Sequence, residues 1–375
     1  MGFEFLMSAE YPKVLVVGPS DRPGGIATVI RSHRAMSLWG LAHCRMLATY
    51  DERDSFMKVA VMLKAYVLAV FEIHHASLIH VHVAAQNSMW RKLPIVLLTK
   101  LMRKPYIVHL HAASERSVFG LTPQWLVRLI FLLSYRVAVL SDSWATVVKK
   151  HLPEARVTVI HNPVRKPQAA RTPEPAGMVL FAGKLERRKG YMELLEAAVG
   201  VLEFFPNVTF CFAGHGEIEQ AKAKAKLLNI EKSVSFLGWI GPEEMGDYYR
   251  RATVFCLPSF DEGLPMAVIE AMSHSLPVVT TPVGGLPDLI SDGTDGLFAR
   301  PGDVHAIVDQ LLGLLRNPER ADRIGRNAAL TIERTCNSVL IEEQLLNLYH
   351  EVNAEWMVRR CGIPEATPLN MQARR

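Results

Sequence analysis

The chain has 375 residues, of which 49% are apolar and 21% charged, a composition that excludes a disordered chain and predicts about two globular domains. Its formal net charge of +5 is uneven, because residues 1–165 hold 20 Lys and Arg against 10 Asp and Glu, whereas residues 166–375 hold 22 against 27. The N-terminal half is therefore expected to face an anionic partner, such as a membrane surface or a phosphorylated molecule, unless the excess is only solvated surface charge. No basic helix or interleaved aromatic pattern favours nucleic acid as that partner.

The cysteines and the apolar segments indicate the cellular setting. The five cysteines are scattered without a Cys-x-x-Cys pair, which argues against zinc and disulfides and is typical of a cytoplasmic protein. Residues 1–11 carry two glutamates and no basic cluster, so they do not resemble a signal peptide. The most apolar stretch, Val59–Phe71, contains Lys64 and is too short to span a bilayer, which predicts a buried or interfacial helix.

In chain order, short β-branched runs alternate with longer helical patterns, as expected for βαβ units and parallel sheets. The strands predicted in the first half are Val14–Val17, Leu78–Val83, Tyr106–Leu110, Val137–Leu140 and Val157–Ile160, and the helices there include Ile26–Leu38 and Leu126–Leu133. Residues 161–177 contain four prolines and are predicted to form an interdomain linker.

The same alternation restarts after the linker. The strands predicted there are Val179–Ala182, Val208–Ala213, Val234–Leu237, Val254–Leu257 and Pro277–Thr280, and the helices are Met192–Glu203, Glu217–Leu228, Pro265–Met272 and Val304–Leu315. Residues 321–360 are predicted to be helical throughout. We therefore predict an α/β protein whose two Rossmann-like domains, residues 1–165 and 166–345, face each other across a ligand-binding cleft.

A glycine-rich loop, Gly18–Gly25, separates the first predicted strand from the first helix. The adjacent Gly24 and Gly25 let backbone N–H groups approach an anion, and the helix N-terminus that follows favours negative charge. The spacing is not Gly-x-Gly-x-x-Gly, which disfavours a dinucleotide, and a tight strand-to-helix turn explains the loop equally well.

A basic loop follows the first strand of the second half. It carries four cations in six residues, which are Lys184, Arg187, Arg188 and Lys189. Its position at the carboxyl end of a strand favours the binding of a diphosphate over the alternative of a solvated basic surface.

Two glutamates separated by seven residues, Glu262 and Glu270, form the third motif. Glu270 lies inside an otherwise apolar helix, where a carboxylate is costly to bury unless another group hydrogen-bonds it. The vicinal hydroxyls of a ribose are such a partner, and an ion pair with a nearby Lys or Arg is the alternative.

These three motifs, in this order and domain placement, resemble the family 4 retaining glycosyltransferases of the GT-B fold. The resemblance runs from Val14 to about Tyr349 and is most specific at the Glu-x7-Glu motif and the two segments after it, Ser275–Val279 and Thr281–Gly285. It implies retaining transfer of a hexose from a UDP- or GDP-sugar to a glycan or lipid-linked acceptor, in bacterial surface-polysaccharide or exopolysaccharide assembly. It also implies that residues 346–375 form a helix that crosses back to the N-terminal domain.

The resemblance implies a role for the charged motif residues. Lys184 and Lys189 are expected to bind the donor diphosphate, although Lys184 stands where the family more often has arginine, so the charge is kept without bidentate geometry. Glu262 is expected to contact the donor sugar near the reacting carbon, and Glu270 is expected to hold the ribose. Together with Lys189 and a histidine, Glu262 forms the predicted catalytic set.

Glycines and histidines complete the predicted site. The resemblance implies that four glycines approach the donor phosphates or the nucleotide: Gly24, Gly25, Gly214 and Gly216. His111 matches the family histidine at the sugar, and His109 competes with it for that role because both lie at the end of the same strand. His80 and His82 alternate in the same way and are interpreted as structural.

No Asp-x-Asp occurs in the chain, so we expect a metal-free site in which lysines and helix N-termini stabilise the departing nucleoside diphosphate. Catalysis would then rest on orientation and leaving-group stabilisation rather than on a dedicated protein base. The alternatives are a sugar-nucleotide epimerase of similar fold and a non-catalytic sugar-nucleotide-binding protein, while the missing Gly-x-Gly-x-x-Gly disfavours a nicotinamide oxidoreductase.

We further expect peripheral association with an anionic membrane, on the cytoplasmic face of the inner membrane. Basic residues flank the apolar segments of the first half and are expected to face lipid phosphates: Arg91, Lys92, Lys100, Arg103, Lys104, Arg128 and Arg136. The alternative is that the apolar faces are ordinary core and the cations only solubilise the protein.

Overall fold

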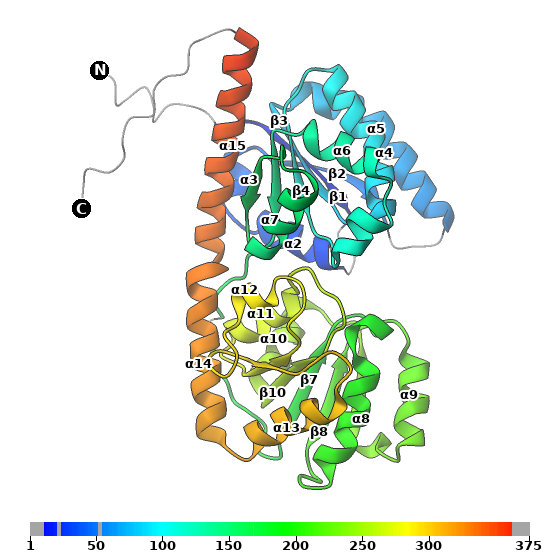
Figure 1. Ribbon diagram of the computed structural model, residues 1–375, viewed down its shortest axis with the longest axis vertical. Helices are drawn as coiled ribbons and strands as arrows, with labels where there is room; N and C mark the ends of the chain where they lie inside the picture. The colour runs from blue at the N-terminus through cyan, green and yellow to red at the C-terminus, as the bar shows by residue number, and fades with distance from the viewer. Residues whose placement is uncertain (1–10, 21–23, 52–54, 168, 362–375) are drawn as a thin grey trace, which may run out of the picture.

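The computed structural model describes residues 11–20, 24–51, 55–167 and 169–361. Within these residues the chain forms two α/β domains, one above the other in Figure 1, each built on a six-stranded sheet. The strand order is β2-β1-β3-β4-β5-β6 in the first sheet and β12-β11-β10-β7-β8-β9 in the second, and neighbouring strands pair in parallel. The predicted α/β fold class with two Rossmann-like domains is confirmed.

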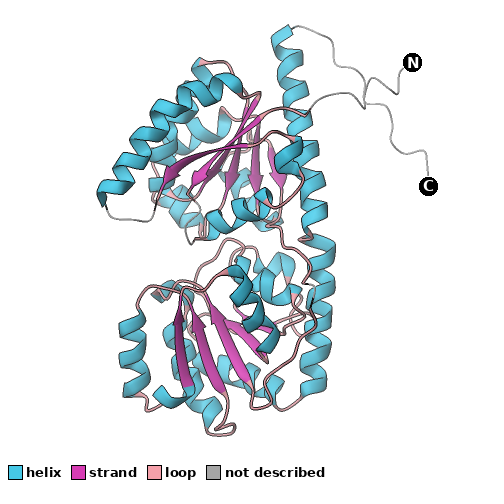
Figure 2. Ribbon diagram, turned by 180° about the vertical axis from the view of Figure 1, so that it is seen from behind, coloured by secondary structure: helices cyan, strands magenta, loops and turns pink. Residues whose placement is uncertain are grey.

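The N-terminal sheet lies between helices on both faces, as Figure 2 shows, and its central strands are fully buried runs rich in Val, Ile and Leu. Its strands are β1 (Val14–Pro19), β2 (Arg45–Tyr50), β3 (Leu78–Val83), β4 (Tyr106–Leu110), β5 (Arg136–Val139) and β6 (Val157–Val159). Its helices are α2 (Gly25–Arg34), α3 (Leu38–Leu41), α4 (Ser55–His75), α5 (Gln86–Leu101), α6 (Gln124–Leu132) and α7 (Asp142–His151), with a π-helical turn η1 (Arg116–Gly120).

The C-terminal domain repeats this plan around a larger core in which Phe181, Phe210 and Phe255 are fully buried. Its strands are β7 (Met178–Ala182), β8 (Thr209–Ala213), β9 (Val234–Gly238), β10 (Val254–Leu257), β11 (Val278–Thr280) and β12 (Leu297–Phe298). Its helices are α8 (Tyr191–Leu202), α9 (Ile218–Leu227), α10 (Pro242–Arg251), α11 (Met266–Ser273), α12 (Leu286–Leu289), α13 (Val304–Leu315) and α14 (Pro318–Thr335), with short 3-10 turns η2 (Arg187–Lys189) and η3 (Glu231–Ser233).

The last helix, α15 (Ser338–Cys361), leaves the C-terminal domain and runs along the N-terminal one (Figure 1). Its buried Ile341, Leu345 and Tyr349 join the core beneath β1 and β3. The prediction of continuous helix over residues 321–360 is wrong, because the chain breaks at 336–337. The Asn337 side chain there accepts a hydrogen bond from the Val339 N–H at 2.9 Å, so it caps α15 instead of continuing α14.

Two other local predictions differ from the structure. The predicted helix Ile26–Leu38 ends at Arg34, and α3 begins as a separate turn at Leu38. The strands β2 and β12, at the edges of the two sheets, were not predicted; β2 is only half-buried and β12 has two residues. The predicted domain bounds at 165 and 345 stay predictions. Among the helices that the structure describes, none has the length and hydropathy needed to cross a membrane.

Candidate active site in the interdomain cleft

A cleft of about 540 Å³ lies between the two domains, at the carboxyl ends of the strands of both sheets. This is the edge at which parallel α/β sheets bind ligands. The N-terminal wall includes residues that follow β3 and β4, Ala84 and His111, together with the first turns of α2. The C-terminal wall includes the loops after β7, β8, β9 and β10, the start of α11 and residues of α10.

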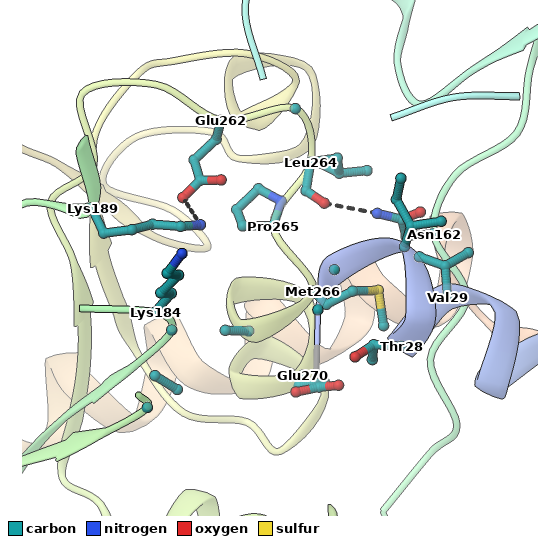
Figure 3. A pocket seen from close by; sticks show the side chains of 18 of the residues that line it. Thr28, Val29, Asn162, Lys184, Lys189, Glu262, Leu264, Pro265, Met266 and Glu270 are labelled. Atoms are coloured by element: carbon teal, nitrogen blue, oxygen red, sulfur yellow. Dashed lines mark hydrogen bonds and ion pairs between the residues drawn. The ribbon is translucent and has the colours of Figure 1, made fainter. Parts of the chain in front are cut away.

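Glu262 is held inside the C-terminal wall, with 4% of its surface exposed. Its Oε1 accepts a hydrogen bond from the Ser259 hydroxyl at 2.8 Å and forms an ion pair with the Lys189 ammonium, which points toward it in Figure 3. The guanidinium of Arg188 lies 3.8 Å from Oε2. This carboxylate is thus charged, paired and fixed in position, as a buried charge must be to be tolerated.

The backbone around Glu262 is held by glycines. Gly284 has a φ of 59°, and a Cβ at that position would lie 1.8 Å from the Glu262 carbonyl oxygen. A Cβ at Gly263 would lie 2.5 Å from the carbonyl oxygen of Ala112, just beyond β4 of the other domain. The loop that carries Glu262 therefore packs backbone to backbone against both its own domain and the strand end that carries His111.

Glu270 lies on the inner face of α11, below Glu262 in Figure 3, and lines the same cleft. The hydroxyl of Tyr249 donates a hydrogen bond to its Oε2 at 2.9 Å. Burial raises the pKa of Glu270 to about 7, and the Tyr249 hydrogen bond and the charge of Arg31 oppose that rise. Tyr249 lies 21 positions earlier, on α10, so no local pattern of the sequence pointed to this pair.

The basic loop contributes three of its four cations to the cleft. Lys184, Arg188 and Lys189 line it, whereas Arg187 does not. The ammonium of Lys184 lies 3.7 Å from a Glu186 carboxylate oxygen, and 45% of its side chain is exposed. Positive charge from this loop therefore lies beside the N-terminus of α11, whose first turn carries no acidic residue.

The predicted glycines divide into two groups. Gly24 and Gly25 line the cleft at the N-terminus of α2, which has no side-chain cap, and Gly214 lines it from the opposite wall. Gly216 does not line the cleft, and its expected place near the nucleotide stays a prediction. A Cβ at Gly216 would lie 2.3 Å from the Leu185 carbonyl oxygen, so close packing explains this glycine. Residues 21–23 of the first glycine loop lie outside the described residues.

Of the two competing histidines, His111 lines the cleft, whereas His109 is fully buried and does not. The Nε2 of His111 lies 2.9 Å from the Nδ1 of His82, so the two rings share a hydrogen bond. Burial, together with the neighbouring histidines and Lys92, lowers the pKa of His111 well below its usual value. His111 is therefore a neutral imidazole that can donate or accept one hydrogen bond in the cleft.

His80, His82 and His109 form a buried stack behind His111. The rings of His80 and His109 are parallel within 5° at a centroid distance of 5.3 Å, and the Nδ1 of His80 lies 2.7 Å from the hydroxyl of Tyr349 on α15. One ring nitrogen of each of the three lies within 4.8 Å of the others, close enough to be considered as ligands of a metal ion. They lie outside the cleft lining, so the expectation of a metal-free cleft stays a prediction.

Contacts between the domains place further residues at the site that sequence reasoning missed. Asn162, in the linker, is 3% exposed, and its Nδ2 donates a hydrogen bond of 2.7 Å to the Leu264 carbonyl oxygen, drawn in Figure 3. Trp239, after β9, lines the cleft with 53% of its surface exposed. Leu264 is 102 positions from Asn162 in the sequence, so no spacing pattern could have revealed this contact.

Comparison with known proteins agrees with this geometry. Residues 165–331, which carry Lys184, Glu262 and Glu270, match the model of the family described as glycosyl transferases group 1. The match covers most of the C-terminal domain. The chain is 32% identical over 188 residues to the phosphatidyl-myo-inositol mannosyltransferase of Mycobacterium leprae, covering 50% of each chain. It is 30% identical over 184 residues to the D-inositol 3-phosphate glycosyltransferase of Corynebacterium glutamicum, covering 47% of this chain and 44% of that protein.

The chain thus spans about half the length of these curated relatives. Over most of its length the chain resembles solved structures, among them HepE of Anabaena in complex with UDP and glucose. That comparison gives a TM-score of 0.72 at 18% identity and covers 91% of this chain and 100% of the other. The resemblance inferred from the three motifs is confirmed for the group 1 family and for the GT-B fold.

Proposed function

We propose that the protein is a nucleotide-sugar-dependent glycosyltransferase. It transfers a hexose, with retention of configuration, from a UDP- or GDP-sugar to a glycan or lipid-linked acceptor in bacterial surface-polysaccharide or exopolysaccharide assembly. The observation that carries this proposal is the convergence of Glu262, Lys189 and Glu270 around the N-terminus of α11, with His111 on the opposite wall of the same cleft. The phosphatidyl-myo-inositol in the name of the first relative supports an acceptor attached to a lipid.

The charges in the cleft suit a departing nucleoside diphosphate. Lys184, Lys189 and the positive end of α11 stabilise the negative charge that develops on the diphosphate as the bond to the sugar breaks. Glu270 accepts hydrogen bonds from the ribose hydroxyls, and Glu262 orients the sugar hydroxyls. His111 is neutral, so it contributes a directed hydrogen bond rather than a charge.

A panel of UDP- and GDP-sugars, tested for binding and for slow hydrolysis, decides between this proposal and its alternatives. A glycosyltransferase binds one donor tightly and releases the nucleoside diphosphate slowly in water and faster with an acceptor. An epimerase converts the donor sugar without any acceptor, and a non-catalytic binding protein retains affinity without turnover. Absence of binding to every member of the panel would contradict the proposal.

An apolar surface on α4 supports the proposed membrane association. Val59, Leu63, Val67 and Phe71 recur at four-residue spacing, and each has half or more of its surface exposed. We call these four residues the outer apolar face. They lie on the α4 side of the N-terminal domain, next to α5, where Leu101 is 79% exposed. A helix face of this kind is suited to insert into the interface of a bilayer.

Two of the cations that the sequence analysis expected to face lipid lie elsewhere in the structure. Lys92 is buried inside the domain and Arg136 is paired with Glu355, so the expectation that these two face lipid is wrong. Lys64 and Arg103 are exposed. We propose that they accompany the outer apolar face on the anionic cytoplasmic surface of the inner membrane, where each cation contributes about 1 kcal/mol.

A further inference from the structure

A second, smaller hollow of about 210 Å³ adjoins the cleft inside the N-terminal domain. We call it the side cavity. It shares Gly24, Gly25, Ile26 and Ala84 with the cleft, so the two hollows meet at the N-terminus of α2. Its other lining residues are Pro19, Ser20, Ala27, Tyr50, Ser88, Arg91 and Lys92.

Lys92 is the most unusual residue of the side cavity. Only 2% of its surface is exposed, and its ammonium donates a hydrogen bond of 2.7 Å to the Ser88 hydroxyl oxygen. Among the residues that the structure describes, no carboxylate forms an ion pair with it. Burial, together with the charge of Arg91, lowers the pKa of Lys92 to about 7. A buried ammonium that has only a hydroxyl partner among the described residues is destabilising, which favours a function over a structural role.

The groups around Lys92 have hydrogen bonds left to donate. The Ser88 oxygen already accepts hydrogen bonds from Lys92 and from the Ala84 N–H at 3.1 Å, so its own proton is free for a further acceptor. The Nε of Arg91 and the hydroxyl of Ser20 are buried and have no partner among the described residues. Arg91 is held in place by its guanidinium, which stacks 4.5 Å from the ring centroid of Tyr50. Three donors and an ammonium match a ligand with several oxygen acceptors.

The helices at the side cavity add to its positive potential. The ten-residue α2 and the sixteen-residue α5 both begin beside it, and neither has an acidic residue in its first turn or a side-chain cap. None of the described residues that line the side cavity carries a carboxylate. Backbone N–H groups at these helix ends thus reinforce Lys92 and Arg91 in attracting an anion.

We propose that the side cavity binds a phosphoryl group of the acceptor, so that the acceptor is a phosphorylated molecule. Because the side cavity opens to the cleft at Gly24 and Gly25, a bound phosphate places the rest of the acceptor in the cleft, between His111 and Glu262. This inference rests on the proposed glycosyl transfer and names the class of its acceptor. A phosphate ester of a soluble sugar and the phosphate of a lipid carrier share this chemistry.

Titration calorimetry with inorganic pyrophosphate tests the site directly when the cleft is already saturated with nucleoside diphosphate, so that the proposed donor site is occupied. We expect saturable binding to the wild-type protein, weakened at least tenfold by Lys92→Met and unchanged by Lys64→Met, which removes an exposed lysine of α4. At pH 7, binding should take up about half a proton, because a group with a pKa of about 7 is half protonated there and the anion favours its charged form. Lys92→Met replaces a buried charge, which has no ion-pair partner among the described residues, by an apolar side chain of similar size, so we expect no loss of thermal stability.

The opposite results overturn the inference. Absence of pyrophosphate binding, equal binding by Lys92→Met, or binding lost in Lys189→Ala but not in Lys92→Met would each exclude the side cavity as the anion site. Titration of the wild-type protein with UDP and GDP tests the proposed function separately. Nucleotide binding without an effect of Lys92 contradicts only the inference, whereas no nucleotide binding contradicts the proposed function.

Acceptor assays then distinguish the sources of the phosphate. A soluble hexose 1-phosphate, a polyprenyl diphosphate-linked sugar in vesicles and the same sugar without phosphate are compared with the donor that the panel identifies. We expect Lys92→Met to raise KM at least tenfold for whichever phosphorylated acceptor is used, with a smaller effect on kcat. An equal rise in KM for the acceptor without phosphate would contradict the inference.

Discussion

The pKa of Glu270 predicts how nucleotide binding depends on pH. Ribose hydroxyls donate hydrogen bonds to the carboxylate, so they favour its charged form, and binding must release the proton that the free protein holds. With a pKa of about 7, this carboxyl is about 90% ionised at pH 8 and only about 10% ionised at pH 6. Affinity for the nucleoside diphosphate should therefore fall about tenfold from pH 8 to pH 6 through this group alone.

Glu270→Gln separates this effect from titration of the nucleotide itself. The variant should lose the part of the pH dependence that belongs to Glu270. At pH 8 it should bind more weakly than the wild type by up to roughly 1.5–3 kcal/mol, the value of a hydrogen bond to a charged group. Folding raises the pKa of Glu270, so this carboxyl contributes stability at low pH that is lost as the pH rises through 7. The variant should therefore melt no lower than the wild type at pH 8.

Isothermal titration of both proteins at pH 6, 7 and 8 measures the effect. The matched control is a 2′,3′-dideoxynucleoside diphosphate, which keeps the phosphates but cannot donate from the ribose. For this ligand we expect wild type and Glu270→Gln to bind alike. Parallel pH profiles of the two proteins for the ordinary nucleotide would refute the assignment of Glu270 to the ribose.

Three further predictions follow from the cleft and its surroundings. Lys189→Ala should lower turnover about 100-fold, because it removes a group that stabilises developing charge, while Arg187→Ala, from the same loop but outside the cleft, should have little effect. The activity of the wild-type protein should resist EDTA. Loss of activity in EDTA that Mg²⁺ restores would contradict the metal-free scheme. Gly284→Ala should lower the free energy of unfolding, measured with denaturant, by more than about 2 kcal/mol, because the new Cβ overlaps a backbone oxygen at a positive φ. The control Gly246→Ala, in open space on α10, should raise the free energy of unfolding by about 0.5–1 kcal/mol. Phe71→Ser should reduce co-sedimentation with anionic vesicles at low salt, and equal recovery of both proteins in the supernatant would leave the outer apolar face without a membrane role.

The sequence was sufficient for the central strands of both sheets, because parallel strands buried on both faces must be continuous apolar, β-branched runs; it missed the edge strands β2 and β12. It was insufficient at positions whose local structure depends on contacts with residues far away in the sequence. The break at Asn337 involves neither Gly nor Pro and depends on a side-chain cap and a bridge to Val164. Strand alternation places His109 and His111 on the same side of the chain, so the pattern cannot distinguish them. β4 ends at Leu110, which leaves His109 buried inside the strand and His111 beyond its end, in the cleft.

Lys92 shows a signal that was present but not used. The buried residues of α5 include Ser88, Lys92, Ile95 and Thr99, which recur at helical spacing. A lysine on the apolar face of a helix, four positions after a serine, indicates a buried ammonium. The prediction that Lys92 faces lipid relied on the net charge of the N-terminal half instead. The pairing of Glu270 with Tyr249 has no such signal, since it joins α11 to α10 only through the tertiary fold.

A crystal structure of the protein with its bound nucleoside diphosphate tests the central claim most directly. We expect the nucleotide in the interdomain cleft, with the ribose hydroxyls within hydrogen-bond distance of the Glu270 carboxylate and the diphosphate within reach of the Lys189 ammonium. A nucleotide bound outside this cleft, or bound in it with the ribose away from Glu270, would contradict the account.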